Sequence, residues 1–182
     1  MSPSRRELSV VPLFIACVWC FLGLLGSLLV RLLALPVRLS LPAPVRYFGL
    51  IPLALAIGFL IWILRYRKFH DVVVSTYLTL RKAITGGLKD ASRPRDEPLI
   101  VQGPQRHVRN PMYFAVVCLI LGLWLLLDYT FLLFLAGLFV LWFNLVLIPI
   151  EQRELRALFG QEFEAYRQAV PRFIPSFKPR WK

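Results

Sequence analysis

Four long apolar runs without a charged residue constrain this chain more than any other feature of its sequence. They cover Leu8–Val30, Tyr47–Leu64, Met112–Leu127 and Phe131–Ile150. An α-helix rises about 1.5 Å per residue, so about 20 apolar residues cross the roughly 30 Å of membrane hydrocarbon. The third run is short for a perpendicular crossing, whereas the first and last are long enough. We therefore predict an all-α integral membrane protein with about four transmembrane helices.

The composition agrees with a membrane protein and excludes a simple soluble domain. The chain is 58% hydrophobic and yet carries a net charge of +12. A soluble domain of this size leaves about a third of its unfolded surface exposed, so it could not hide so many apolar side chains. Basic residues beside apolar spans report topology and attraction to anionic headgroups. Nucleic-acid binding would require a basic, water-facing domain, and the sequence contains none.

The distribution of Lys and Arg predicts the orientation. The N-terminus, the stretch Arg65–Arg109 and the C-terminal tail hold most of the cations, so we place both termini on the cytoplasmic side. Four crossings satisfy this arrangement, although Arg38 and Arg46 then lie on the opposite side. We expect no cleaved signal peptide, because the first apolar run is too long and no small-residue cleavage site follows it.

The segments between and after the runs also carry predictions. Asp71–Leu80 is mostly apolar and is followed by Arg81 and Lys82, which predicts a helix lying at the interface. Residues 128–130 predict a tight turn, so the last two runs form a helical hairpin. Glu151–Tyr166 has apolar residues at helical spacing and predicts an amphipathic helix. We divide the chain into an N-terminal helix pair, residues 1–65, and a C-terminal part, residues 66–182.

Cysteine and histidine give no metal or redox signal. Cys17, Cys20 and Cys118 all lie inside apolar runs, where small side chains serve helix packing. The C-x-x-C of the first two lacks the strand–helix context of a redox motif. His70 and His107 stand far apart in the sequence, so we predict no metal site.

The ionisable residues that remain gather at one membrane face. A transporter or channel would carry charge inside its spans, and these spans are uncharged. A tight hairpin returns its two ends to the same depth, which predicts that Arg109, Asn110, Tyr113 and Glu151 converge. Such groups at the mouth of an apolar hairpin suit a polar ligand that meets an apolar one.

Three motifs in this region occur in a recognisable order. The chain reads L-I-V-Q-G-P-Q-R-H-V-R-N-P-M-Y over Leu99–Tyr113, E-x-x-x-L-x-x-x-F-G-x-x-F-x-x-Y over Glu151–Tyr166, and V-P-R-F-I-P over Val170–Pro175. This pattern resembles the isoprenylcysteine carboxyl methyltransferase family and its relatives, the phospholipid N-methyltransferases. The resemblance extends from about Ile84 to Pro175, and the first two spans match only as apolar segments.

The resemblance implies a membrane-embedded methyltransferase that binds S-adenosylmethionine on the cytoplasmic side and methylates a lipophilic acceptor among membrane lipids. It makes residues 66–182 the catalytic part, with Arg109, Asn110 and Glu151 as catalytic residues. The cofactor-binding residues implied by it, together with weaker glycine matches, are Gly86, Gly87, Val101, Gly103, His107, Arg109, Asn110, Pro111, Tyr113 and Glu151.

The chain departs from the family pattern at three positions. Gln152 replaces the second acid of an acidic pair, which leaves Glu151 alone to hold a cationic or hydroxyl-bearing part of the cofactor. Gln105 and His107 stand where tyrosines are usual. A sulfonium cation is best held by a carboxylate and aromatic faces, and an arginine fork suits a carboxylate of either the cofactor or the acceptor.

Other interpretations of the same residues stay open. Arg109 and Glu151 also fit topology and helix-end charges, and Asn110 with Pro111 fits the start of the third helix. Membrane reductases of the sterol-reductase type resemble this family in their C-terminal half and bind NADPH there. A non-enzymatic membrane scaffold is the second alternative. The acceptor, whether prenylcysteine carboxylate, phospholipid amine or small thiol, is left open by the sequence.

Overall fold

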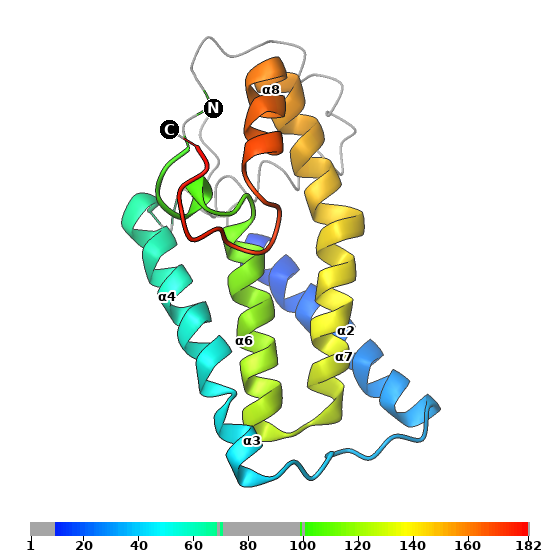
Figure 1. Ribbon diagram of the computed structural model, residues 1–182. Coiled ribbons are helices and arrows are strands. Elements are labelled where there is room, and N and C mark those ends of the chain that lie inside the picture. Colours follow the sequence, from blue (N-terminus) through cyan, green and yellow to red (C-terminus); the bar gives the residue numbers. More distant parts are fainter. Residues whose placement is uncertain (1–9, 69, 71–98, 100, 182) are drawn as a thin grey trace. The chain divides into compact units, whose positions relative to one another are not determined.

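The computed structural model describes residues 10–68, 70, 99 and 101–181 (Figure 1). The predicted interfacial helix over Asp71–Leu80 lies outside these residues. The chain forms two compact units. Unit 1 combines Met1–Val11, Trp62–Pro111 and Asn144–Lys182, and unit 2 combines Pro12–Ile61 and Met112–Phe143. Each unit is described separately below, and the predicted division at residue 65 stays a prediction.

All regular elements of the described residues are helical, as predicted. They are α2 (Val10–Leu32), α3 (Ala43–Tyr47), α4 (Leu50–Tyr66), the 3-10 turn η2 (Gly103–Arg106), α6 (Pro111–Leu127), α7 (Thr130–Trp142), the π turn η3 (Phe143–Leu147) and α8 (Ile148–Ala169). Three stretches of the described residues are helical, long and apolar enough to cross a membrane: Val10–Leu32, Ala43–Tyr66 and Thr130–Ala169. The fourth apolar helix, α6, is shorter, with 17 residues. The prediction of an all-α integral membrane protein is confirmed.

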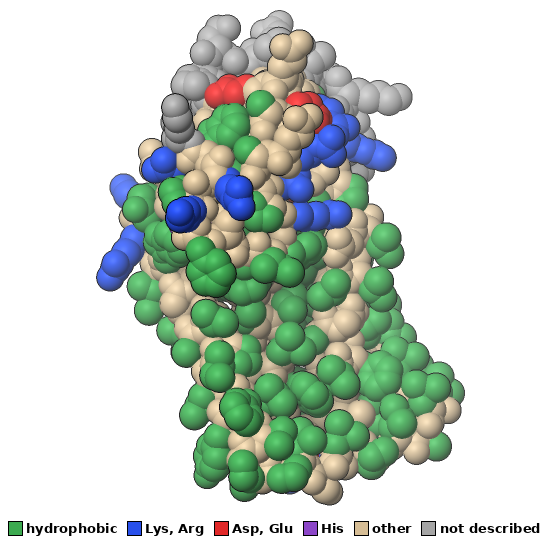
Figure 2. Space-filling view, in the orientation of Figure 1, with side chains coloured by type: hydrophobic (Ala, Val, Ile, Leu, Met, Phe, Trp, Pro, Cys, Tyr) green, Lys and Arg blue, Asp and Glu red, His purple; other side chains and the backbone are tan. Residues whose placement is uncertain are grey.

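The surface of unit 2 requires an apolar solvent. Large apolar side chains of α2 point outward, with Phe21 64% and Leu24 72% exposed. Figure 2 shows many hydrophobic side chains on the face of this unit that is in view. A water-soluble monomer rarely exposes a contiguous apolar patch larger than a few hundred Å². The exposed side chains of unit 2 therefore fit contact with lipid.

Unit 2 is held together by close helix packing at glycines. A Cβ atom placed on Gly122 of α6 would lie 2.9 Å from the backbone oxygen of Gly49 and 2.9 Å from the backbone nitrogen of Leu53 in α4. Lipid provides no hydrophobic driving force between helices, so membrane helices associate through such close contacts of small residues. The packing of α2 on α7 at Gly26 is less tight: a Cβ atom there would lie 3.3 Å from the backbone oxygen of Phe131 and 3.6 Å from the backbone nitrogen of Leu135.

The predicted tight hairpin turn is confirmed between α6 and α7. Asp128 adopts the left-handed conformation, with φ of 60°, and its Oδ2 accepts a hydrogen bond of 2.9 Å from the backbone N–H of Leu41. Thr130 donates its backbone N–H to Val37 and its hydroxyl to Pro36. The turn is thus attached to the proline-rich loop that follows α2.

Arg38 of that loop and Arg46 of α3 both have structural partners. Arg46 donates two hydrogen bonds, of 3.0 and 2.7 Å, to the carbonyl oxygen of Leu126 at the end of α6. Arg38 donates to the hydroxyl of Tyr129 at 2.6 Å, with its guanidinium 4.4 Å from the ring centroid. A cation at a helix C-terminus is stabilising. The contacts account for the two cations that the Lys and Arg distribution did not explain.

The last span differs from the predicted division into a span ending at Ile150 and a separate tail helix. The π turn follows α7 directly and continues into α8, with Pro149 at its start. Proline cannot donate a hydrogen bond to the carbonyl four residues earlier, and π turns accommodate such interruptions without ending the helix. The backbone instead kinks at Gly160, where φ is 50° and ψ is −119°. Glycine adopts this left-handed region at little steric cost.

Unit 1 has a small apolar core of its own. Phe163, Tyr166 and Val170 are buried, and partly buried apolar side chains pack around them: Leu99, Val101, Leu155, Phe159 and Trp181. The hydroxyl of Tyr166 donates to the carbonyl oxygen of Gln105 at 2.8 Å. This core joins the second half of α8 to the segment that carries the first family motif.

Candidate functional site

The motif segment and the C-terminal tail are joined by a series of hydrogen bonds in unit 1. The backbone N–H of Arg109 donates to the carbonyl oxygen of Pro171 at 2.9 Å, and the amide of Asn110 donates to that of Arg172 at 3.1 Å. The Nε of Arg106 donates to the carbonyl oxygen of Trp181 at 2.7 Å, and the Arg180 N–H returns a bond to Arg106. The two segments therefore hold each other in position.

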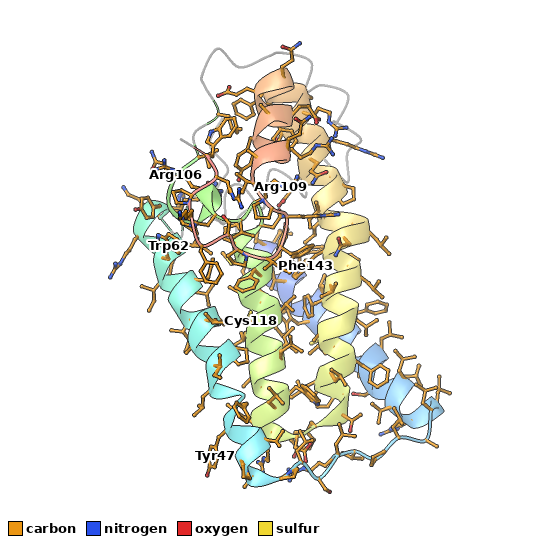
Figure 3. The ribbon with its side chains drawn as sticks, in the orientation of Figure 1. Tyr47, Trp62, Arg106, Arg109, Cys118 and Phe143 are labelled. Carbon is orange, nitrogen blue, oxygen red and sulfur yellow. The ribbon has the colours of Figure 1, made fainter. Side chains whose placement is uncertain are left out.

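His107 belongs to the same series. Its Nδ1 lies 2.8 Å from the carbonyl oxygen of Ser176, and its own carbonyl oxygen accepts from the Ser176 N–H and hydroxyl. Its ring centroid lies 5.2 Å from that of Trp62. Figure 3 labels Trp62 and also Arg106, the residue before His107 in the chain. These contacts give the imidazole a role in attaching the tail, and its predicted role in cofactor binding stays a prediction.

Arg109 is the predicted site residue with the most distinctive surroundings. Its Nε and Nη1 atoms are buried and make no hydrogen bond to the described residues. Burial lowers the pKa of its guanidinium, and the neighbouring charges of Arg167 and Arg172 act in the same direction, whereas Tyr166 and Glu164 oppose them. A buried donor without a partner costs free energy, more so when it is charged. The arrangement suits an anionic ligand.

An open pocket of about 360 Å³ lies beside this arginine in unit 1. Three of its lining side chains are arginines, Arg109, Arg167 and Arg180, and the described residues that line it include no acidic side chain. Sequence reasoning did not select Arg167 or Arg180, because neither falls on a quoted motif position. Their only signal in the sequence was the general excess of cations in the tail. This pocket will be called the arginine pocket.

Two of the predicted cofactor residues have clear backbone or packing roles. Gly103 is buried with φ of +55°, and a Cβ there would lie 2.4 Å from Cδ2 of Tyr66. Only glycine fits this position without strain. Val101 packs against the apolar core of unit 1. Both residues set the path of the chain toward Arg109.

Glu151 lies in the first turn of α8 and is partly buried. It belongs to unit 1, as do Arg109, Asn110 and the buried Pro111, which begins α6. The first turn of a helix favours a carboxylate, which completes the helix dipole. The charged neighbours that shift the pKa of Arg109 are Arg167, Arg172 and Glu164, together with Tyr166, so joint action of Arg109 and Glu151 on one ligand stays a prediction.

Tyr113 belongs to unit 2, where it begins a row of aromatic rings. It stacks on Phe143 with centroids 4.3 Å apart and an interplanar angle of 18°. Phe143 contacts Phe139 at 5.4 Å, and Phe139 contacts Trp19 at 4.6 Å. The row joins α6, the π turn, α7 and α2. Aromatic faces attract cations such as a sulfonium, and the stack fixes the orientation of the Tyr113 ring.

The remaining predictions concern glycines and metals. Gly86 and Gly87 lie outside the described residues. Within the described part of the chain, no group of three or more His, Cys, Asp and Glu side chains could hold a metal ion.

The comparison with family models yields one match. The model described as phospholipid methyltransferase matches residues 45–162, which is more than half of the chain. The matched range includes the second apolar span, which the motifs alone did not connect to a family. No curated protein and no solved structure was found to match.

Proposed function

This chain belongs to the phospholipid methyltransferase family, and we propose that it transfers the methyl group of S-adenosylmethionine to a lipophilic acceptor at the membrane. The family match makes the chain a membrane methyltransferase. The cofactor, the acceptor class and the site residues are the proposal. The observation that carries it is the pair of buried Arg109 atoms, Nε and Nη1, which make no hydrogen bond to the described residues; Arg109 lies on a family motif, and its backbone N–H donates to the tail.

The residues of unit 1 suit the chemical groups of this cofactor. S-adenosylmethionine supplies, when bound, a methyl group on a sulfonium cation, and it carries a carboxylate. Arg109 offers two buried donor atoms, Nε and Nη1, that can donate charge-assisted hydrogen bonds to an anionic group such as this carboxylate. Glu151 offers a carboxylate for a cationic or hydroxyl-bearing part. The amide nitrogen of Asn110 donates to the carbonyl oxygen of Arg172, and its amide oxygen can accept a hydrogen bond from a donor group of the cofactor.

In this proposal these residues position the cofactor relative to the acceptor and exclude water from the Arg109 side chain. Methyl transfer to a nucleophile requires in-line approach, and correct positioning of two reactants provides much of an enzyme's acceleration. The hydrogen bonds between the motif segment and the tail fix the backbone of Arg109 and Asn110. Burial of the Arg109 side chain strengthens its attraction for an anion, because the local dielectric is low.

An acceptor that arrives from the bilayer agrees with the surface of unit 2, which exposes apolar side chains on every described helix. A prenylated or acylated molecule partitions into lipid, so it would reach a site at the membrane surface by lateral diffusion. We place the site and both termini on the cytoplasmic side, from the distribution of Lys and Arg.

Ligand-dependent thermal stability tests the cofactor. S-adenosylhomocysteine should raise the melting temperature of the purified chain in detergent micelles, because a ligand that binds only the folded state stabilises it. At a hundredfold excess over Kd the stabilisation is about 2.7 kcal/mol. A shift with NADPH and none with S-adenosylhomocysteine would support a reductase instead. A shift with neither would favour a membrane scaffold.

Two substitutions test the residues. Glu151→Gln and Arg109→Ala should each weaken S-adenosylhomocysteine binding by about ten- to a hundredfold, the usual effect of removing one charged contact. Glu154→Gln, three residues further along α8, is the matched control for Glu151 and should bind normally. If Arg109 holds an acceptor carboxylate, Arg109→Ala should keep cofactor affinity and lose turnover. Wild-type affinity and rate in both variants would remove these residues from the site.

A further inference from the structure

The tail that follows α8 carries two large apolar side chains that unit 1 leaves uncovered. Ile174 is 80% exposed, and Phe177 is fully exposed. The backbone on both sides of Phe177 is fixed, because Ser176 and Arg180 donate their N–H groups to carbonyl oxygens of the motif segment at 3.0 and 2.9 Å. Apolar side chains that are held in water cost free energy. An uncovered pair on a fixed backbone therefore indicates contact with an apolar environment.

The hydrogen bonds of the tail also determine its depth in the membrane. The apolar helix α6 begins at Pro111 and has 17 residues, which makes it about 25 Å long. The hydrocarbon layer is about 30 Å thick, so the segments directly before and after α6 are drawn to its boundary. Arg109, two residues before Pro111, donates its backbone N–H to Pro171. Because two residues span at most about 7 Å, the start of the tail lies at this boundary.

We propose that the tail is an interfacial anchor, in which Ile174 and Phe177 insert into the membrane boundary beside the start of α6. The charges of the tail suit this place. Lys178 and Arg180, both exposed, lie one and three residues after Phe177. Such long side chains extend their charged groups toward the headgroups, while apolar neighbours occupy the boundary of the acyl chains. The anchor is a property of the tail surface and requires no bound ligand.

The anchor gives the membrane a part in holding the motif segment. The carbonyl oxygens of Pro171 and Arg172 accept hydrogen bonds from the backbone N–H of Arg109 and from the amide of Asn110. Insertion keeps a tail that has detached at the depth of the motif segment, which raises its effective concentration there and favours its return. The membrane therefore stabilises the positions of Arg109 and Asn110. Their role in cofactor binding rests on the proposed function, whereas the anchor itself does not.

Spin-label accessibility measures the depth of the tail directly. Phe177→Cys is made in the full chain with its native cysteines replaced by alanine, labelled with a nitroxide and placed in nanodiscs of dioleoylphosphatidylcholine. Labels at Leu24 of α2, which is 72% exposed, and at the exposed Gln161 of α8 give the lipid and water references. The ratio of collisions with oxygen to collisions with a polar nickel complex should be at least about threefold higher at position 177 than at position 161.

Two results would overturn the anchor. A ratio at position 177 equal to that at position 161 would place the tail in water. A label that neither oxygen nor the nickel complex reaches would show that protein, such as a second copy of the chain, covers the tail. Ile174→Cys gives an independent second measurement, which should show the same high ratio and which decides the question if Phe177→Cys does not fold.

Hydrogen exchange tests the consequence for the motif segment. In the same nanodiscs, Phe177→Ser should speed exchange of the backbone N–H groups of Arg109 and Ser176 about fivefold, because the tail detaches more often. Lys178→Ser is the matched control: it changes the exposed neighbouring side chain, removes no apolar contact and should alter exchange less than about twofold. Equal exchange in the wild type and Phe177→Ser would refute a part of the membrane in holding the segment.

Neither measurement uses S-adenosylhomocysteine, so the two proposals can fail separately. Absence of S-adenosylhomocysteine binding, with position 177 in the membrane boundary, would contradict only the proposed function. A label in water at position 177, with intact binding of S-adenosylhomocysteine, would contradict only the anchor.

Discussion

Replacement of Gly103 by alanine tests whether the motif segment depends on its backbone conformation. Gly103 has φ of +55°, and an added Cβ would lie 2.4, 2.7 and 2.9 Å from Cδ2, Cε2 and Cγ of Tyr66. A residue other than glycine in the left-handed region costs roughly 1–2 kcal/mol. Displacing the Tyr66 ring adds about 1–2 kcal/mol, the usual range for overpacking and forced rotamers. We expect Gly103→Ala to destabilise the chain by about 2–4 kcal/mol.

A double substitution separates the two contributions. Tyr66 is 52% exposed, so Tyr66→Ala alone should cost little, and it removes the ring that the new methyl group would meet. Gly103→Ala in the Tyr66→Ala background should then retain only the backbone cost of about 1–2 kcal/mol. Gly58→Ala is the control, since nothing lies within 4 Å of the Cβ position of Gly58 in α4.

Thermal unfolding in detergent micelles, followed by circular dichroism, measures these effects. A loss of about 2–4 kcal/mol corresponds to a decrease in Tm of roughly 4–16 °C for a chain of this length. S-adenosylhomocysteine binding should weaken in the same variant, because the segment carries Arg109. The reasoning is refuted if Gly103→Ala melts with the wild type, or if Tyr66→Ala restores its full stability.

Two further predictions concern the spans. Gly122→Ala should lower Tm by several degrees, since its Cβ would meet backbone atoms of Gly49 and Leu53 at 2.9 Å, whereas Gly137→Ala, with open space around it, should not. Equal Tm changes in the two variants would contradict close packing of α6 against α4. A cysteine at position 178 of a cysteine-free variant should react with an impermeant reagent only from the cytoplasmic side, and labelling from the opposite side would refute the four-span topology.

Much of the helical architecture follows from the sequence because lipid imposes strict local rules. A span must satisfy every backbone hydrogen bond internally and must be apolar, so length and hydropathy indicate its position. The predicted first span, Leu8–Val30, ends two residues before the observed α2, Val10–Leu32, and its predicted start lies outside the described residues. The hairpin turn could also be predicted from the sequence, since Asp128 interrupts an apolar stretch.

The path of the chain after the last span was not readable in the same way. The apolar pattern changes character near Ile150, which predicted a separate tail helix, and yet helix continues through the π turn and Pro149 to a kink at Gly160. Hydropathy reports the surroundings of a residue and contains no direct information on whether the backbone hydrogen bonds continue. The chain changes direction at Gly160, which has a positive φ. Glycine also occurs inside regular helices, so its presence in the sequence did not predict a kink.

Part of the candidate site was predicted from the sequence, and part became visible only in the folded chain. Residue types and spacing in the motifs selected Arg109, Asn110 and Glu151, because each family motif is a short stretch of sequence that can be recognised without the structure. The pairing of the motif segment with the tail, the unpartnered donors of Arg109 and the arginine pocket with Arg167 and Arg180 required the folded chain. About 60 to 75 residues separate these partners. Contacts over such distances depend on how the core of unit 1 packs, and local pattern has no access to that packing.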